Sequence, residues 1–172
     1  MNKKTRKLTF NGIMAAFAVV FVYISSVFPT GQLGFAAIAS LFVAAAVIEN
    51  GLISGLLVYV ASSAVSLLIV PGKAQVLLYI FFFGYYHIVK SLSERTGSRI
   101  LEWLIKLASF NISLSLFIFL FKVTLVSFSW LSGRDYLLYI LGNIVFIVFD
   151  LGLSRLFVLY RSKISSRIGK FH

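Results

Sequence analysis

The sequence contains no cysteine, and only five acidic residues, two histidines and two prolines occur among its 172 residues. Without cysteine the chain forms no disulfide and offers no thiolate as a nucleophile or metal ligand. The acidic residues and histidines are scattered, with no histidine pair at metal-ligand spacing, no Gly-x-Ser-x-Gly motif and no phosphate-binding glycine loop. We therefore expect no enzyme, no bound metal and no cofactor.

Apolar residues make up most of what is present. Hydrophobic residues account for 60% of the chain and charged residues for 12%, and the mean hydropathy is +0.99. These values exceed what a soluble core of this size requires, so they predict an all-α integral membrane protein of one domain, residues 1–172. The net charge of +11 lies at the ends of apolar runs, where it marks a membrane side, and we therefore expect no nucleic-acid partner.

Lysine and arginine gather at three places: before the first apolar run, in the polar interval 90–103, and after the last run. Because cytoplasmic segments are enriched in these residues, all three places are expected to be cytoplasmic, with an even number of crossings between them. We predict six transmembrane helices in one bundle in the plasma membrane, with both termini cytoplasmic. The predicted spans are residues 8–28, 35–48, 52–70, 76–89, 104–126 and 136–160.

Small residues in the second and third spans predict close helix packing. Ala36, Ser40 and Ala44 recur every four positions, which places them on one stripe of a helix. Gly51 and Gly55 form a similar pair at the start of the third span. This pair is interpreted as internal packing of the second span against the third, with dimerisation as the alternative.

Aromatic residues dominate the fourth span. Tyr79, Tyr85 and Tyr86 lie near its ends, where tyrosine usually anchors a helix in the membrane interface. His87 follows them, and we expect it to be an interfacial residue beside Lys90.

Ionisable residues at membrane depth need a partner or a function, because each costs about 3 kcal/mol on insertion scales. Lys106 in the fifth predicted span and Asp150 in the sixth lie at a similar depth, so we predict an ion pair between them. Arg155, about one turn nearer the cytoplasm, is the competing partner for Asp150. The pair is interpreted as structural, with a role in coupling or transport as the alternative.

Polar and aromatic residues also gather toward the predicted outer face. Such a set is typical of a site for a small, flat or anionic solute. Loops that face water have the same composition, so an ordinary outer surface is the alternative. The residues are Gln32, Lys73, Gln75, Tyr79, Lys122, Trp130, Arg134, Tyr139 and Asn143.

The chain resembles the substrate-binding S components of energy-coupling factor vitamin transporters. The resemblance rests on a basic start leading into Leu8-Thr-Phe-Asn-Gly-Ile-Met-Ala-Ala16, on six predicted spans in 172 residues and on an early half rich in Gly and Ala. In that family a small-xxx-small motif on the first helix docks on a membrane coupling subunit, and Gly12 and Ala16 hold the matching positions. The first outer loop, here residues 28–34, gates the family's substrate. The resemblance implies a bacterial uptake subunit for a vitamin-like micronutrient, with a coupling subunit and ATPases as partners.

A second resemblance is to the MreD-type proteins of the bacterial elongation machinery. It rests on the segment Ile48-Glu-Asn-Gly-Leu-Ile-Ser-Gly-Leu-Leu57 and on the aromatic stretch 79–86 with its Gly84-Tyr85. This resemblance implies a membrane scaffold in cell-shape or envelope assembly, with cell-wall synthesis proteins as partners.

Overall fold

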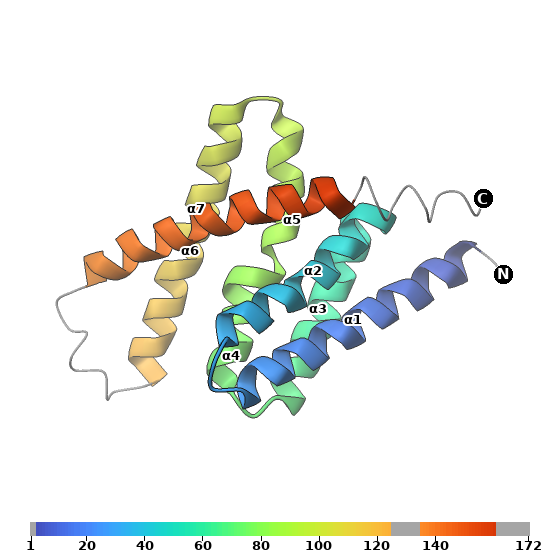
Figure 1. Ribbon diagram of the computed structural model, residues 1–172, viewed down its shortest axis with the longest axis horizontal. Helices are drawn as coiled ribbons and strands as arrows, with labels where there is room; N and C mark the ends of the chain where they lie inside the picture. The colour runs from blue at the N-terminus through green and yellow to red at the C-terminus, as the bar shows by residue number, and fades with distance from the viewer. Residues whose placement is uncertain (1–2, 125–134, 161–172) are drawn as a thin grey trace. The chain divides into compact units, whose positions relative to one another are not determined.

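The structure is a computed structural model that describes residues 3–124 and 135–160 (Figure 1). The chain divides into two compact units, Met1–Ile118 and Phe119–His172, and each is described by itself. Every regular element within the described ranges is a helix, which confirms the all-α prediction.

Both units are built of helices, and each predicted span overlaps one long helix except span 76–89, which is divided among three short ones. The helices extend beyond the predicted spans at several polar ends, because backbone hydrogen bonding continues where the apolar run stops. The elements are α1 (Lys3–Val27), α2 (Gln32–Asn50), α3 (Leu52–Ile69), α4 (Lys73–Leu78), the π-helix η1 (Tyr79–Gly84), α5 (Tyr86–Ser93), the 3-10 turn η2 (Glu94–Thr96), α6 (Arg99–Thr124), whose end enters the second unit, and α7 (Asp135–Tyr160).

Length and hydropathy make the helices compatible with a multi-pass membrane protein. Within the described residues, five segments are long and apolar enough to cross a bilayer: Lys3–Val27, Gln32–Asn50, Leu52–Ile69, Lys73–Thr96 and Arg99–Phe119. Helix α7 has 26 residues, of which only Asp135, Asp150 and Arg155 are charged. A helix of that length measures about 39 Å, more than the hydrocarbon thickness of a bilayer.

Helices α1, α2 and α3 pack side by side in the first unit (Figure 1). The predicted stripe of Ala36, Ser40 and Ala44 on α2 is buried, each residue being at most 2% exposed. Gly55 of α3 lies so close to α2 that an added Cβ would collide with the side chain of Val47. The predicted packing of these two helices through small residues is therefore confirmed, and it allows the close backbone approach that van der Waals attraction needs.

A single glycine connects α2 to α3. Gly51 has φ 86° and ψ 174°, a region of backbone conformation that only glycine adopts readily. Its N–H donates to the Val47 carbonyl at 3.0 Å. The neighbouring Asn50 amide donates to the Asn11 side-chain oxygen at 3.2 Å, which ties this turn to α1.

We expect Gly51→Ala to lower the free energy of unfolding by about 1 kcal/mol, because a Cβ strains this conformation. The measurement is denaturant or thermal unfolding of the purified protein in detergent. Gly34→Ala is the matched control, since Gly34 is helical and a Cβ there meets nothing within 4 Å. Equal stability of the two variants would contradict the strain argument.

The fourth apolar segment contains a π-helical stretch, Tyr79–Gly84. Each π turn holds an extra residue, so the residues after it face a different direction from those of a continuous α-helix. The Tyr59 hydroxyl of α3 donates to the Ile80 carbonyl in this stretch at 3.1 Å. The Tyr59 ring also lies over Gly84, where an added Cβ would come within 2.6 Å of the ring. Tyr59 therefore holds the π stretch against α3.

The side chains of Tyr79, Tyr86 and His87, which we expected at the membrane interface, are buried inside the first unit. They are 0%, 2% and 1% exposed, respectively. The Tyr79 hydroxyl lies 2.8 Å from the Ser62 hydroxyl, and His87 Nε2 lies 2.9 Å from the Ser40 hydroxyl. Serines of α3 and α2 thus offer hydrogen bonds to the Tyr79 hydroxyl and to His87 Nε2, which lowers the cost of burying these polar atoms in an apolar interior.

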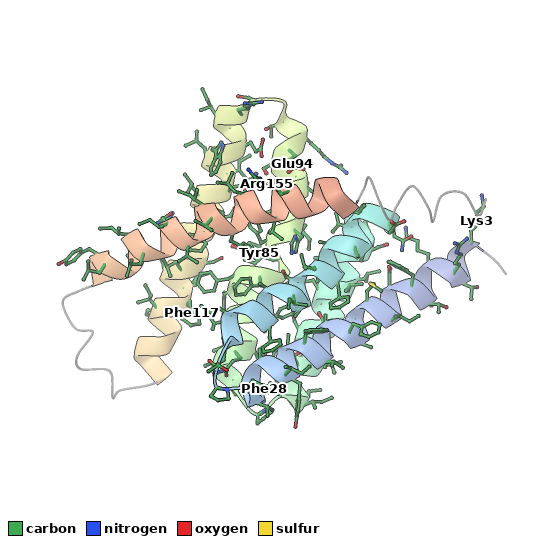
Figure 2. All side chains as sticks on the ribbon, in the orientation of Figure 1. Lys3, Phe28, Tyr85, Glu94, Phe117 and Arg155 are labelled. Atoms are coloured by element: carbon green, nitrogen blue, oxygen red, sulfur yellow. The ribbon has the colours of Figure 1, made fainter. Side chains whose placement is uncertain are left out.

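Helices α5 and α6 form a hairpin, and the interval 90–103 is its largely helical tip. Only η2, Gly97 and Ser98 separate the two helices, and Gly97 has φ 71°. Below the tip, the Tyr85 hydroxyl donates to the Ser109 carbonyl at 3.1 Å and lies 2.7 Å from the Ser113 hydroxyl. Aromatic contacts continue the interface, with Phe82 packed on Phe110 and on Phe117, which Figure 2 labels together with Tyr85.

Candidate functional site

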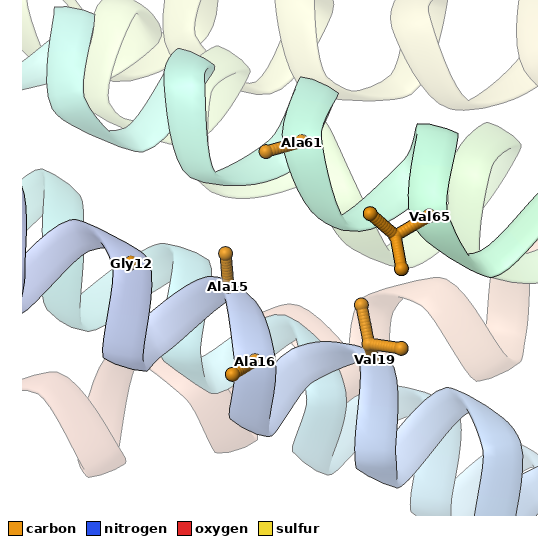
Figure 3. A pocket seen from close by; sticks show the side chains of 6 residues that line it. All are labelled: Gly12, Ala15, Ala16, Val19, Ala61 and Val65. Carbon is orange, nitrogen blue, oxygen red and sulfur yellow. The ribbon is translucent and has the colours of Figure 1, made fainter.

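An open apolar groove of about 390 Å³ lies between α1 and α3 (Figure 3). One wall comes from α1, where four small residues are spaced i, i+3, i+4 and i+7 and therefore share a face. The other wall comes from the middle of α3. The lining residues are Gly12, Ala15, Ala16, Val19, Ala61 and Val65.

Gly12 and Ala16, the predicted docking pair, lie on the outward face of this groove. Both are exposed, and among the described atoms nothing lies within 4 Å of a Cβ added to Gly12. Helix α1 instead buries Ala18, Val22 and Ser25 against its neighbours. The small pair is therefore not used for packing α1 inside the first unit.

The groove offers shape and apolar surface but no hydrogen bond, since its lining is only glycine, alanine and valine. It can receive an apolar surface, either a neighbouring helix or a lipid chain. In a bilayer such a contact is held by van der Waals packing, which grows as small residues let the two surfaces approach.

Two of the residues predicted to bind a solute meet at one end of the first unit. The Gln75 amide of α4 donates to the Gln32 side-chain oxygen of α2 at 3.1 Å. This contact links the start of α2 to the start of α4. The connections before both helices are outer ones in the predicted topology. The Gln32–Gln75 contact is the part of the predicted solute site that the described residues bring together.

Lys73 and Tyr79 have structural roles in the first unit. The Lys73 ammonium group donates to the carbonyls of Leu67 and Val70 at 2.6 and 3.0 Å, so it caps the C-terminus of α3, where a cation is favoured. The Tyr79 side chain lies in the core beside Ser62. Neither side chain lines the α1–α3 groove.

The remaining predicted solute residues lie in the second unit or outside the described residues. Tyr139 and Asn143 belong to α7, where the Asn143 amide donates to the Tyr139 carbonyl at 2.7 Å. Lys122 lies in α6 with a side chain outside the described set, and Trp130 and Arg134 lie outside the described residues. The outer solute site as a whole therefore stays a prediction.

The predicted ion pair between Lys106 and Asp150 joins the two units and also stays a prediction. Within α6, Lys106 forms a salt bridge with Glu102, and its ammonium group lies 5.6 Å from the centre of the Trp103 ring. In α7, Asp150 is buried, whereas Arg155 is exposed.

Sequence reasoning missed a second buried lysine. Lys90 of α5 is only 1% exposed, and its ammonium nitrogen lies 3.3 Å from a carboxylate oxygen of Glu94. Glu94 follows Lys90 by four residues, and Lys106 follows Glu102 by four. This i, i+4 spacing of opposite charges was the signal in the sequence that could have revealed both pairs.

The two ion pairs lie at matching heights on the α5–α6 hairpin. Because the helices run antiparallel, the contacts of Tyr85 with Ser109 and Ser113 set a register that brings Lys90 level with Lys106. In each pair the lysine is buried and the more exposed carboxylate lies nearer the tip. Long lysine side chains reach from an apolar region toward polar partners in this way.

Among the described residues, the candidate features are the α1–α3 groove, the Gln32–Gln75 contact and the two ion pairs of Lys90 and Lys106. No protein-family model matches the chain, and neither a curated protein nor a solved structure is significantly similar to it.

Proposed function

We propose that the protein is an integral membrane solute-binding subunit of an uptake transporter for a vitamin-like micronutrient. In this proposal the chain crosses the plasma membrane six times in one bundle, has both termini in the cytoplasm and is energised by separate partners. The observation that carries it is the outward-facing α1–α3 groove with Gly12 and Ala16 on its surface. These two positions match the docking motif of the S components that the sequence resembles.

A transmembrane helix of a coupling subunit fits the groove physically. Side chains of a facing helix can enter the space over Gly12 and Ala16, which brings the two backbones close together. The groove wall from α3 adds Ala61 and Val65, so the partner helix would contact two helices at once. A contact of this kind forms without any hydrogen bond, in agreement with the apolar lining.

The distribution of cations supports the orientation. In the predicted layout, eleven basic residues of the tails and loops lie on the cytoplasmic side. Two, Lys73 and Arg134, lie on the outer side. Cytoplasmic loops carry such an excess. The five long apolar segments are consistent with this layout.

The docking test replaces Ala16 with leucine, which fills the groove. We expect a tagged Ala16→Leu protein, purified from the membranes of its own cells, to retain at most about one tenth of the coupling subunit and ATPases that accompany the original chain, a loss of about 1.4 kcal/mol. Ala108→Leu is the matched control, since Ala108 is an exposed alanine of α6. Equal recovery of ATPases with both variants would contradict docking at the groove.

The solute test is a ligand-dependent rise in melting temperature of the purified protein across a panel of vitamins. A ligand that binds only the folded state stabilises it by mass action, by about 2.7 kcal/mol at one hundred times its dissociation constant. A stabilising vitamin would support the proposal. The absence of any shift, together with co-purification of cell-wall synthesis proteins in place of ATPases, would overturn it.

The alternative is a membrane scaffold of the MreD type in cell-shape or envelope assembly. It is favoured by the way polar side chains inside the first unit bind one another, as in the pairs of Tyr79 with Ser62 and Tyr85 with Ser113. Two glycines of the segments behind that resemblance have structural roles. Gly51 forms the turn between α2 and α3, and Gly84 forms the close contact with the Tyr59 ring. The co-purified partners distinguish the two functions.

A further inference from the structure

The tip of the α5–α6 hairpin has its polar and apolar side chains arranged in the opposite way to a hairpin in water. Lys90 and Lys106 are only 1% and 2% exposed, and Ser93 is fully buried. Four large apolar side chains of the same two helices lie on the outside instead, each at least 50% exposed. These four, which we call the tip face, are Leu92, Ile100, Leu101 and Leu104.

This arrangement indicates which medium surrounds the tip face. In water, a hairpin buries its leucines and leaves its lysines exposed. In a bilayer the preference is reversed, because apolar side chains are stable against acyl chains, whereas ionisable side chains face the protein interior and pair with one another. The pairs of Lys90 with Glu94 and of Lys106 with Glu102 follow the second pattern. The tip face therefore fits the hydrocarbon of a bilayer.

The exposed polar residues of the tip occupy one short range. Within residues 90–104, every exposed polar residue lies in the range 94–99, which includes Glu94, Arg95 and Arg99. Glu94 is labelled at the end of the hairpin in Figure 2. Exposed apolar side chains begin again at the next residue, Ile100. Arginines at such a boundary lie level with lipid headgroups, whose negative charge attracts them.

The length of α6 agrees with a membrane boundary at this level. Among the described side chains of α6, the large exposed apolar ones run from Ile100 to Phe119, about 29 Å along the helix axis. The hydrocarbon layer of a bilayer has nearly the same thickness. The range Arg99–Phe119 is also apolar enough to cross a membrane. It leaves Lys122, which the predicted span 104–126 included, beyond the far end, where a charge is less costly.

We propose that the α5–α6 hairpin is embedded in the inner leaflet of the membrane almost to its end, with lipid acyl chains covering the tip face. The headgroup layer then begins at residues 94–99, and the ammonium groups of Lys90 and Lys106 lie inside the hydrocarbon layer. Only the short turn reaches the cytoplasm, in place of the whole predicted interval 90–103. This inference rests on the membrane location in the proposed function and not on solute uptake.

The test uses the absence of cysteine from the chain, since an introduced thiol is then the only one. Leu101→Cys and Leu104→Cys proteins are placed in lipid nanodiscs and labelled with a water-soluble maleimide. We expect both to react at least about tenfold more slowly than Thr96→Cys, because apolar surroundings keep a thiol protonated and only the thiolate reacts. Ile112→Cys is the control for a site deeper in the membrane, since Ile112 is an exposed residue of α6, and it should be equally slow.

Spin labels on the same cysteines distinguish lipid from a covering protein. Oxygen concentrates in hydrocarbon, whereas a polar nickel chelate stays in water. We expect oxygen to relax the labels at positions 101, 104 and 112, and the chelate to relax the label at position 96. Protection of positions 101 and 104 from both agents would show a covering protein and overturn the proposal.

Maleimide labelling of positions 101 and 104 as rapid as that of position 96 would place the tip face in water and also overturn the proposal. Slow labelling of position 112 in the same experiment would leave the membrane location intact. Rapid labelling of position 112 as well would refute the membrane location itself. None of these results changes the outcome of the vitamin or ATPase experiments.

Discussion

Replacing Gly84 with alanine is expected to lower the free energy of unfolding by about 3 kcal/mol, at the upper end of the cost of overpacking. A Cβ at this position would lie 2.6 and 2.7 Å from two atoms of the Tyr59 ring and 3.1 Å from the Tyr79 carbonyl. The ring has little freedom to move, since its hydroxyl is bound to the Ile80 carbonyl. The Tyr59 contact is relieved only if α3 and the π stretch separate, and the carbonyl contact, which lies within the π stretch, only if its backbone changes conformation.

The measurement is denaturant or thermal unfolding in detergent, with Gly12→Ala as the control because a Cβ at Gly12 meets nothing within 4 Å. A double-mutant cycle with Tyr59→Ala assigns the cause. In the Tyr59→Ala background, Gly84→Ala should cost much less, since the ring is gone. A cost that is unchanged in that background would place the strain elsewhere.

Gly55→Ala is expected to lower the free energy of unfolding by about 2 kcal/mol, again through overpacking. The added Cβ would overlap the Val47 side chain of α2, and Gly55 itself is buried. Valine is β-branched, so rotation about its χ1 angle gives little relief. The two helices must therefore move apart at this contact.

Val47→Ala provides the rescue for this variant. In the double variant Val47→Ala/Gly55→Ala, the smaller side chain at position 47 leaves room for the Cβ added at position 55. We therefore expect most of the stability lost in Gly55→Ala to return. Gly34→Ala is the control for a change in helix propensity alone, since alanine is favoured over glycine in a helix. Destabilisation that persists in the double variant would contradict close packing of α2 on α3 as the cause.

Much of the helical arrangement could be predicted from the sequence. The apolar runs gave each long helix, and the stripe of Ala36, Ser40 and Ala44 identified a face that α2 does bury. The glycines at 51 and 55 marked a turn and a helix contact, both of which the structure contains. These features could be predicted because glycine and alanine act through size and backbone conformation, which are local properties.

The interior polar residues could not be predicted in the same way. Tyr79, His87 and Lys90 were expected near the interface or in the cytoplasmic interval, yet all three are buried. The π stretch precedes two of them and changes the direction in which they face, and no local signal for a π turn was recognised in the sequence. Ser62 and Ser40, the partners of Tyr79 and His87, come from other helices, so only the folded chain identifies them.

The sequence by itself determined that this chain is helical, where its long apolar helices lie and which turns need glycine, because these depend on backbone chemistry and on runs of neighbouring residues. The tertiary structure decided which face of each helix is inside. It turned Gly12 and Ala16 outward to form a groove and turned Lys90 and Lys106 inward beside Glu94 and Glu102. In an apolar helix the lipid-facing and interior faces have nearly the same hydrophobicity, so periodicity cannot separate them, and only contacts between helices do.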